Sequence, residues 1–154
     1  MKIFNSTAAV VKNVATLVTI AFCYIYLIAS WANIPDRIPQ RYDFAGNITD
    51  WGSKGMLWIM PLIMLGLAVL LTVVGMFPST WNTGVTVTEE NRARVYGVLK
   101  GMLDTLKLTI CLMFTAITIT SARAVDMPWW STFVMLGLIF VPIVVYMVLL
   151  FRAR

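Results

Sequence analysis

The sequence predicts an all-α polytopic membrane protein, because the chain is too apolar for a soluble domain and its apolar residues gather into four long stretches. Hydrophobic residues make up 60% of the 154 residues and charged residues 12%, whereas an ordinary soluble domain is about 45–50% apolar. We expect one four-helix transmembrane domain over residues 1–154, with an outer loop at 34–54 and helices at about 14–33, 55–77, 89–122 and 128–151.

Three of these stretches are uninterrupted spans. The first is free of charge from Asn13 to Pro35, the second begins directly after Lys54, and the last starts at Pro128 and is closed by Arg152. A helix of about 20 residues, rising about 1.5 Å per residue, crosses the hydrocarbon core of a bilayer. Each stretch therefore predicts one spanning helix.

The third stretch differs, because between Lys107 and Arg123 only residues 108–122 are uncharged. These residues cover about 22 Å of a hydrocarbon core of about 30 Å. Either Lys107 and Arg123 extend their charged ends to the membrane surface, or Lys107 and Asp104 lie inside the membrane edge.

The distribution of basic residues predicts that both termini are cytoplasmic and that the 34–54 loop is extracytoplasmic. The outer basic residues are matched by Asp36, Asp43, Asp50 and Asp126, so the formal charge of +5 falls inside. Trp31, Trp51, Trp129 and Trp130 fall at the expected outer interface, where aromatic residues are enriched. The excess of basic residues therefore indicates how the chain is oriented in the membrane, and it argues against nucleic-acid binding. The inner basic residues are Lys2, Lys12, Arg92, Arg94, Lys100, Lys107, Arg152 and Arg154, and the outer ones are Arg37, Arg41, Lys54 and Arg123.

A cleaved signal peptide is the competing interpretation of the N-terminus, because Lys2 precedes an apolar run and Ser30–Trp31–Ala32 loosely resembles a cleavage site. The run is longer and more aromatic than a usual signal sequence, so we expect a retained spanning helix.

The inventory of catalytic side chains is thin. The chain has no histidine, and Cys23 and Cys111 both fall within predicted spans, where a disulfide or a metal site is not expected. No nucleophile stands at a recognisable spacing from a base, and no glycine loop of the phosphate-binding type occurs. We therefore expect no enzymatic activity, no cofactor and no metal.

The outer loop concentrates turn-forming and aromatic residues. Pro35 and Pro39 fix the backbone in extended or turn conformations, so the first helix must end before them. Gly46–Asn47 forms a turn, and residues 41–45 and 48–51 on either side form a short hairpin or a tight reversal. A loop that only connects two helices needs fewer turn-forming residues than this. A role in binding or gating is therefore an alternative to a purely connecting role.

The loop also resembles a known family. Pro35-x-x-Ile38-Pro39, Gly46, Asp50–Trp51 and Gly52–Ser53–Lys54, followed at once by a spanning helix, resemble the bacterial membrane family of domain of unknown function 1648. That module forms the N-terminal part of SdpI-type immunity proteins, which protect a producing cell from its own secreted peptide toxin.

The resemblance implies a bacterial cytoplasmic (inner) membrane location and a surface for a peptide toxin or a membrane partner protein. The family usually has a histidine where this chain has Arg41, which favours a salt bridge or an anion contact over titration or metal binding. The candidate binding residues are Pro35, Asp36, Pro39, Arg41, Tyr42, Phe44, Gly46, Asp50, Trp51 and Lys54.

The third helix carries a second candidate site. Lys100, Asp104 and Lys107 recur at i, i+4 and i+7, which places them on one helix face. Because exposing Asp104 to lipid would be costly, we expect this face to be turned toward other helices and Asp104 to pair with Lys100 or Lys107. The face is either a salt bridge that stabilises a long helix or part of a transport or gating path.

Thr86 and Glu89 fit a capping box, which predicts that this helix begins near Thr88.

Gly97 and Gly101 form a GxxxG step that predicts close helix packing. The partner helix lies either in the same chain or in a second copy, so a homo-oligomer is one outcome.

Three classes of function follow. The first is a binding or immunity module that uses the outer loop. The second is a small transporter or channel that uses the Lys100, Asp104 and Lys107 face, and the third is a packing subunit of a larger membrane complex. The lipid bilayer is a partner in all three.

Overall fold

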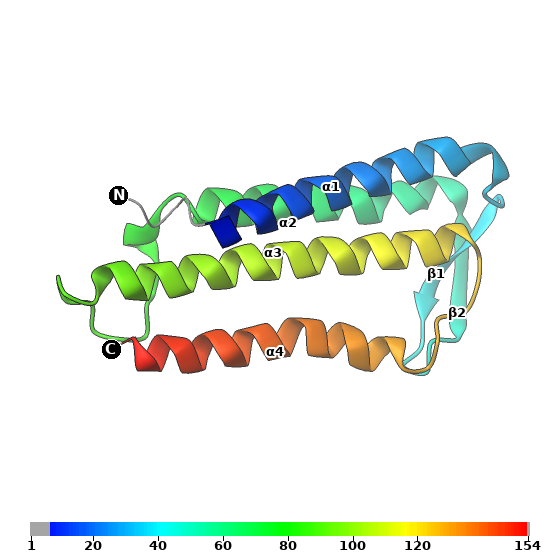
Figure 1. The fold of residues 1–154 in the computed structure, drawn as a ribbon. Coiled ribbons are helices and arrows are strands. Elements are labelled where there is room, and N and C mark those ends of the chain that lie inside the picture. Colours follow the sequence, from blue (N-terminus) through cyan, green and yellow to red (C-terminus); the bar gives the residue numbers. More distant parts are fainter. Residues whose placement is uncertain (1–6, 154) are drawn as a thin grey trace.

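The computed structural model describes residues 7–153 and contains four antiparallel helices with a two-stranded hairpin at one end (Figure 1). All four helical segments are long and apolar enough to cross a membrane, so the chain is a multi-pass membrane protein. Lys2 and Arg154, which enter the count of basic residues, lie outside the described residues. The elements are α1 (Thr7–Ser30), η2 (Trp31–Asn33), β1 (Arg37–Tyr42), β2 (Ile48–Ser53), η3 (Lys54–Trp58), α2 (Ile59–Val74), η4 (Pro78–Thr80), α3 (Arg92–Ala122) and α4 (Ser131–Arg152).

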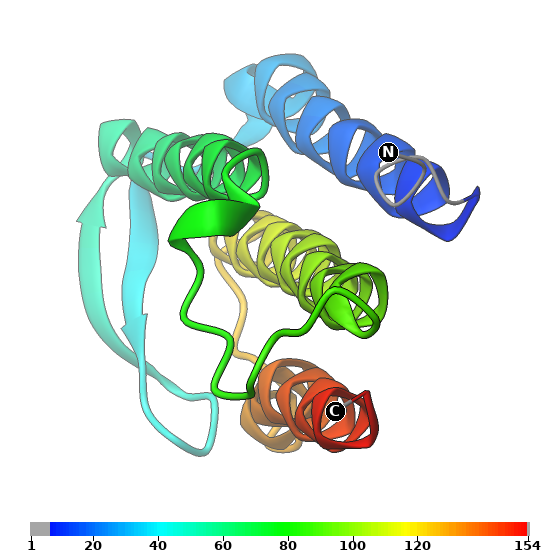
Figure 2. The same cartoon turned by 90° about the vertical axis from the view of Figure 1, so that its left-hand side faces the viewer.

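Helix α3 is the centre of the bundle. It packs against α1, α2 and α4, and the end-on view places α4 on the side of α3 away from α1 and α2 (Figure 2). Its 31 residues span about 46 Å, which exceeds the hydrocarbon core of about 30 Å. The helix is therefore longer than one crossing of the hydrocarbon core requires, and its first turn carries Arg92 and Arg94.

Three layers of buried apolar side chains follow one another along the bundle. The cap layer lies beneath the hairpin, the middle layer lies between α1, α2 and α3, and the inner layer lies where α3 begins and α4 ends. The cap layer contains Leu27, Ile34, Ile38, Leu57 and Ala122; the middle layer Cys23, Met64, Ala68 and Cys111; and the inner layer Val95, Leu99 and Ala153.

The first helix begins at Thr7 rather than at about residue 14. The sequence prediction took Lys12 as a residue outside the span. In the structure the Lys12 ammonium donates to Tyr146 Oη at 2.8 Å and to the Gly101 carbonyl at 3.3 Å. Because the charge is satisfied inside the bundle, the helix continues through Lys12.

The third helix begins at Arg92 rather than at residue 89, and the predicted pairing of Thr86 with Glu89 is wrong. Thr88 and Asn91 make the reciprocal contacts instead, with the Thr88 amide donating to Asn91 Oδ1 at 2.8 Å and the Asn91 amide donating to Thr88 Oγ1 at 3.3 Å. Glu89 is almost fully exposed. The capping contacts therefore lie two residues later in the chain than predicted, and the Asn91 side-chain amide takes the place of the predicted Glu89 carboxylate.

The structure adds a two-stranded hairpin to the predicted all-α fold, and the hairpin lies where the sequence predicted a short hairpin or a tight reversal. β1 and β2 are antiparallel, with Ile38 opposite Gly52 and Pro39 opposite Trp51, and the register shifts on either side of Arg41. Pro39 lacks an N–H donor, but in a two-stranded sheet every strand is an edge strand, where proline is tolerated. β1 therefore begins before the predicted 41–45 and ends earlier, at Tyr42, while β2 extends beyond the predicted 48–51 to Ser53.

Gly46 provides a test of how the hairpin tip is held. Its φ is +92°, and a Cβ there would overlap the carbonyl of Met127, whereas Gly84 has φ +64° with nothing near its Cβ position. Gly84→Ala should cost only the left-handed strain of about 1–2 kcal/mol. Gly46→Ala should cost this strain and, in addition, the steric overlap of the new Cβ with the Met127 carbonyl. It should therefore lower the melting temperature in detergent more than Gly84→Ala does, and it should increase tryptic cleavage after Arg41. Equal effects of the two substitutions would show that the tip is not packed against residue 127.

Candidate functional site

The hairpin tip is built by Asp43 and Asn47. The Asp43 amide donates to the Asn47 carbonyl at 2.9 Å, and the Gly46 amide donates to the Asp43 carbonyl at 3.0 Å. The Asp43 carboxylate accepts from the Asn47 amide and from Asn47 Nδ2, both at 2.8 Å. These hydrogen bonds lower the pKa of the Asp43 carboxyl, because they favour its ionised form.

The tip is docked onto the connection between α3 and α4. The Met127 amide donates to the Gly46 carbonyl at 2.8 Å, the Ile48 amide donates to Asp126 Oδ1 at 2.9 Å, and Thr132 Oγ1 donates to the Phe44 carbonyl at 3.0 Å. We call residues 34–54 in this docked arrangement the hairpin cap. The cap ties the end of α1 to the start of α4 across the end of α3 (Figure 1).

Tyr42 and Lys54 anchor the two sides of the hairpin cap. Tyr42 Oη lies 3.3 Å from Ser121 Oγ and donates to the Val125 carbonyl at 3.4 Å; burial raises the pKa of the Tyr42 phenol. Lys54 Nζ donates to the Ile34 carbonyl at 2.9 Å and lies 4.8 Å from the centre of the Trp31 ring. Both residues have structural contacts that their sequence context did not reveal.

The other predicted cap residues divide by exposure. Pro39 and Gly46 are buried and shape the backbone. The exposed residues, which can meet a partner, are Pro35, Asp36, Arg41, Phe44, Asp50 and Trp51.

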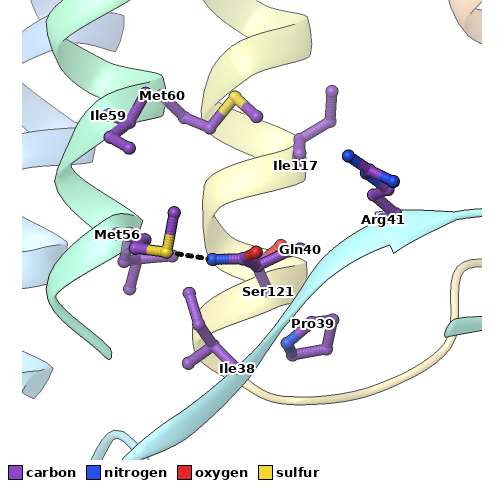
Figure 3. A pocket seen from close by; sticks show the side chains of 10 residues that line it. Ile38, Pro39, Gln40, Arg41, Met56, Ile59, Met60, Ile117 and Ser121 are labelled. Atoms are coloured by element: carbon purple, nitrogen blue, oxygen red, sulfur yellow. Dashed lines mark hydrogen bonds between the residues drawn. The ribbon is translucent and has the colours of Figure 1, made fainter. Parts of the chain in front are cut away.

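A small cavity of about 180 Å³ lies under β1, between the hairpin, α2 and α3. Its walls are mostly apolar, with Pro39 of β1, Met60 of α2 and Ile117 of α3 among them, and Arg41 stands at one side (Figure 3). Gln40 donates to the sulfur of Met56 and closes another side. Because an apolar cavity of about 150 Å³ can hold benzene, this cavity has room for one apolar side chain.

The second candidate site surrounds Asp104. This carboxylate is 1% exposed, and its Oδ1 accepts from Lys100 Nζ at 2.5 Å and lies 3.5 Å from Lys107 Nζ. The pairing that the spacing predicted is present, and it involves both lysines. Asp104 Oδ2 has no hydrogen-bond partner among the residues that the structure describes.

Lys107 joins three helices. Besides Asp104 of α3, its ammonium donates to Asn13 Oδ1 of α1 at 2.5 Å and to Thr72 Oγ1 of α2 at 3.2 Å. These two hydrogen bonds and the ion pair with Asp104 hold the Lys107 ammonium against three helices.

A second group of polar contacts joins α1 to α4 through Lys12 and Tyr146, which line one cavity with Lys100 and Asp104. Tyr146 Oη, which accepts from Lys12, also lies 3.0 Å from Thr105 Oγ1. A Cβ on Gly101 would lie 3.0 Å from the Tyr146 ring, so the glycine of the predicted GxxxG step allows close packing within the same chain. The inner polar cluster, as we call it, consists of Lys12, Asn13, Thr72, Lys100, Asp104, Thr105, Lys107 and Tyr146.

Sequence reasoning missed Lys12, Asn13, Thr72 and Tyr146. Lys12 and Asn13 were assigned to the membrane flank because they precede an apolar run. Tyr146 had one usable signal, since it is a polar-tipped side chain in the middle of an otherwise apolar stretch.

The family comparison bears on the first site. Residues 18–65 match the family model described as "Domain of unknown function (DUF1648)". Residues 18–65 are a DUF1648 domain. No curated protein and no solved structure was found to match the chain.

The DUF1648 domain contains the whole hairpin cap, together with the half of α1 nearest the cap and the first turns of α2. Every residue of the inner polar cluster lies outside residues 18–65. The hairpin cap therefore lies within the residues that match the DUF1648 model, and the inner polar cluster lies outside them.

Asp104→Asn tests whether the cluster stabilises the fold. The substitution leaves Lys100 and Lys107 without a counter-charge, and breaking a buried ion pair in this way typically costs about 3–5 kcal/mol. The melting temperature in detergent should fall strongly. The matched control is Glu89→Gln, which removes an exposed partner 3.9 Å from Arg92 and should cost less than about 1 kcal/mol. Similar melting temperatures for the two variants would contradict a stabilising role of Asp104.

Proposed function

We propose that the protein is a binding protein of the bacterial cytoplasmic membrane, whose hairpin cap faces outward and binds a membrane-active peptide, protecting the membrane from that peptide. The observation that carries the proposal is the hairpin cap itself: it is a folded, docked surface, and it lies entirely within the DUF1648 domain. The resemblance to SdpI-type immunity proteins, whose N-terminal part is formed by this module, supports a protective role. The role is one of binding, without catalysis.

The chemistry of the hairpin cap supports a peptide as the ligand. Trp51 and Phe44 are 44% and 62% exposed, and aromatic side chains are frequent anchors in peptide and protein recognition. The cavity of about 180 Å³ beside Arg41 has room for one apolar side chain, and the guanidinium can pair with a carboxylate. A peptide that lies on the membrane surface presents both kinds of group.

The charges at the two ends support the orientation. At the cap end the four basic residues stand beside Asp36, Asp43, Asp50 and Asp126. The opposite end carries an excess of lysine and arginine, which favours the cytoplasm. We infer that the hairpin cap is extracytoplasmic and that both termini are cytoplasmic.

A small transporter or channel is the second candidate, and the inner polar cluster favours it. Ionisable side chains inside a membrane often line the path of an ion or a substrate. The middle layer closes the interior between the cluster and the cap, so transport would require α1, α2 and α3 to separate. Flux into proteoliposomes that is lost in Asp104→Asn and kept in Trp51→Ala would favour transport over binding at the cap.

Toxin challenge tests the proposed role of the hairpin cap. Sensitive bacteria that express the chain should survive a secreted membrane-permeabilising peptide at concentrations that depolarise cells without it. Trp51→Ala removes an exposed anchor, and Ile117→Phe fills the cavity under β1. Each should reduce the protective concentration range at least tenfold, since losing a binding hot spot costs about 2 kcal/mol or more.

Two controls make this result specific. Trp129→Ala removes a tryptophan that is 70% exposed at the same end of the bundle but outside the DUF1648 domain, and it should keep protection. A cysteine at Thr49 should react with an impermeant reagent on intact cells, and one at Glu90 only after permeabilisation. Full protection by Trp51→Ala and Ile117→Phe together would remove the function from the hairpin cap, and the reverse labelling pattern would overturn the orientation.

A further inference from the structure

A cleft of about 1000 Å³ opens at the end of the bundle opposite the hairpin cap, between α2, α3 and the segment that connects them. Figure 2 views the molecule from this end. The cleft reaches from Arg92 and Glu89, near the start of α3, to the buried Lys107. Its wall includes apolar side chains, Met76 and Pro78 among them.

The charges around this cleft are unbalanced. Arg92, Lys100 and Lys107 line it together with one carboxylate, Glu89. A second cavity of about 340 Å³ shares Lys100 and adds Lys12, Arg94 and Asp104. Five cations thus face two carboxylates at this end of the bundle, and an anion that enters would meet a positive potential.

Lys100 and Lys107 are not equivalent in this setting. The Lys107 ammonium donates to Asn13 and Thr72 and lies 3.5 Å from the Asp104 carboxylate. Lys100, within the part of the chain described, hydrogen-bonds only to Asp104, and its side chain is 15% exposed. Two N–H donors of Lys100 therefore remain for a group in the cleft.

The position of the cleft suits a lipid better than a small ion. Helix α2 ends at Val74, close to Thr72 and Gly75 in the wall of the cleft, so the cleft lies at the depth where lipid headgroups meet acyl chains. Arg92, Tyr96 and Lys100 follow one another at i, i+4 and i+8 along α3, and the Arg92 guanidinium lies 5.9 Å from the centre of the Tyr96 ring. The cleft also holds far more than one phosphate group, and its apolar wall can accept the start of an acyl chain.

We propose that this cleft binds an anionic phospholipid, with the phosphodiester on Lys100 and the outer part of the headgroup toward Tyr96 and Arg92. A zwitterionic phospholipid brings its own cation into an already positive cleft, so it binds more weakly. The site is independent of the peptide surface on the hairpin cap, and it gives the Lys100 donors a role beyond the ion pair with Asp104.

The test measures lipid binding to the full chain in detergent, by native mass spectrometry and by the shift in melting temperature. Phosphatidylglycerol should bind and stabilise the protein, whereas phosphatidylcholine with the same acyl chains and inorganic phosphate should do so at least tenfold more weakly. Lys100→Met should reduce the apparent affinity for phosphatidylglycerol about tenfold or more, since a hydrogen bond to a charged group contributes about 1.5–3 kcal/mol. Lys100→Arg should restore binding.

Two further variants guard against a general loss of folding. Arg92→Gln lies outside the inner polar cluster and should weaken phosphatidylglycerol binding without lowering the melting temperature of the lipid-free protein. Arg152→Gln removes an exposed cation at the same end, outside the cleft, and should leave binding unchanged. Equal binding of the two lipids, or unchanged binding in both Lys100→Met and Arg92→Gln, would overturn the proposal. Tight binding of inorganic phosphate that displaces phosphatidylglycerol would assign the site to a free anion instead.

Discussion

The buried carboxylate of Asp104 sets the constraint on which the rest of the bundle depends. An ionised group inside a membrane protein must be paired, because its desolvation is costly. Asp104 is paired by two lysines, and Lys107 must itself be satisfied by Asn13 and Thr72. Apolar side chains of different helices gain little by leaving lipid for one another. The polar contacts therefore fix how α1 and α2 lie against α3.

The helices are joined at both ends of the bundle, but by different kinds of contact. At the inner end, charged side chains join the helices through the inner polar cluster. At the hairpin end, the cap joins them through hydrogen bonds to the Asp126 carboxylate and the Met127 amide and through the phenol of Tyr42. The cap end is close to neutral and presents aromatic side chains, whereas the inner end is strongly basic. The proposed peptide surface and the proposed lipid site each match the chemistry of the end at which they lie.

Local patterns in the sequence predicted much of this arrangement. The four spans follow from runs of apolar residues, and the shared face of Lys100, Asp104 and Lys107 follows from helical spacing. Gly46 and Asn47 marked the reversal, because a turn is determined by neighbouring residues. The start of α3 was misplaced since Thr88 and Asn91 fulfil the capping contacts about as well as Thr86 and Glu89 fulfil the motif.

Contacts between distant segments could not be predicted in the same way. Lys12 and Tyr146 are separated by most of the chain, and nothing in the residues around Lys12 distinguishes a buried ammonium from a cytoplasmic one. The early start of β1 depends on the pairing of Arg37 with Ser53, and the tight turn at Gly46 depends on Met127, which lies beyond two further helices. These features arise only when the whole bundle is assembled.

The most direct test of the central claim is a double-mutant cycle between Asn13 and Lys107, whose hydrogen bond joins α1 to α3 beside Asp104. The free energy of unfolding in detergent would be measured for Asn13→Ala, Lys107→Met and the double variant. If the cluster holds the helices together, the two substitutions should be coupled by about 1 kcal/mol or more, in the range found for contacting residues in a polar network. Additive effects within about 0.3 kcal/mol, as for independent sites, would contradict the account.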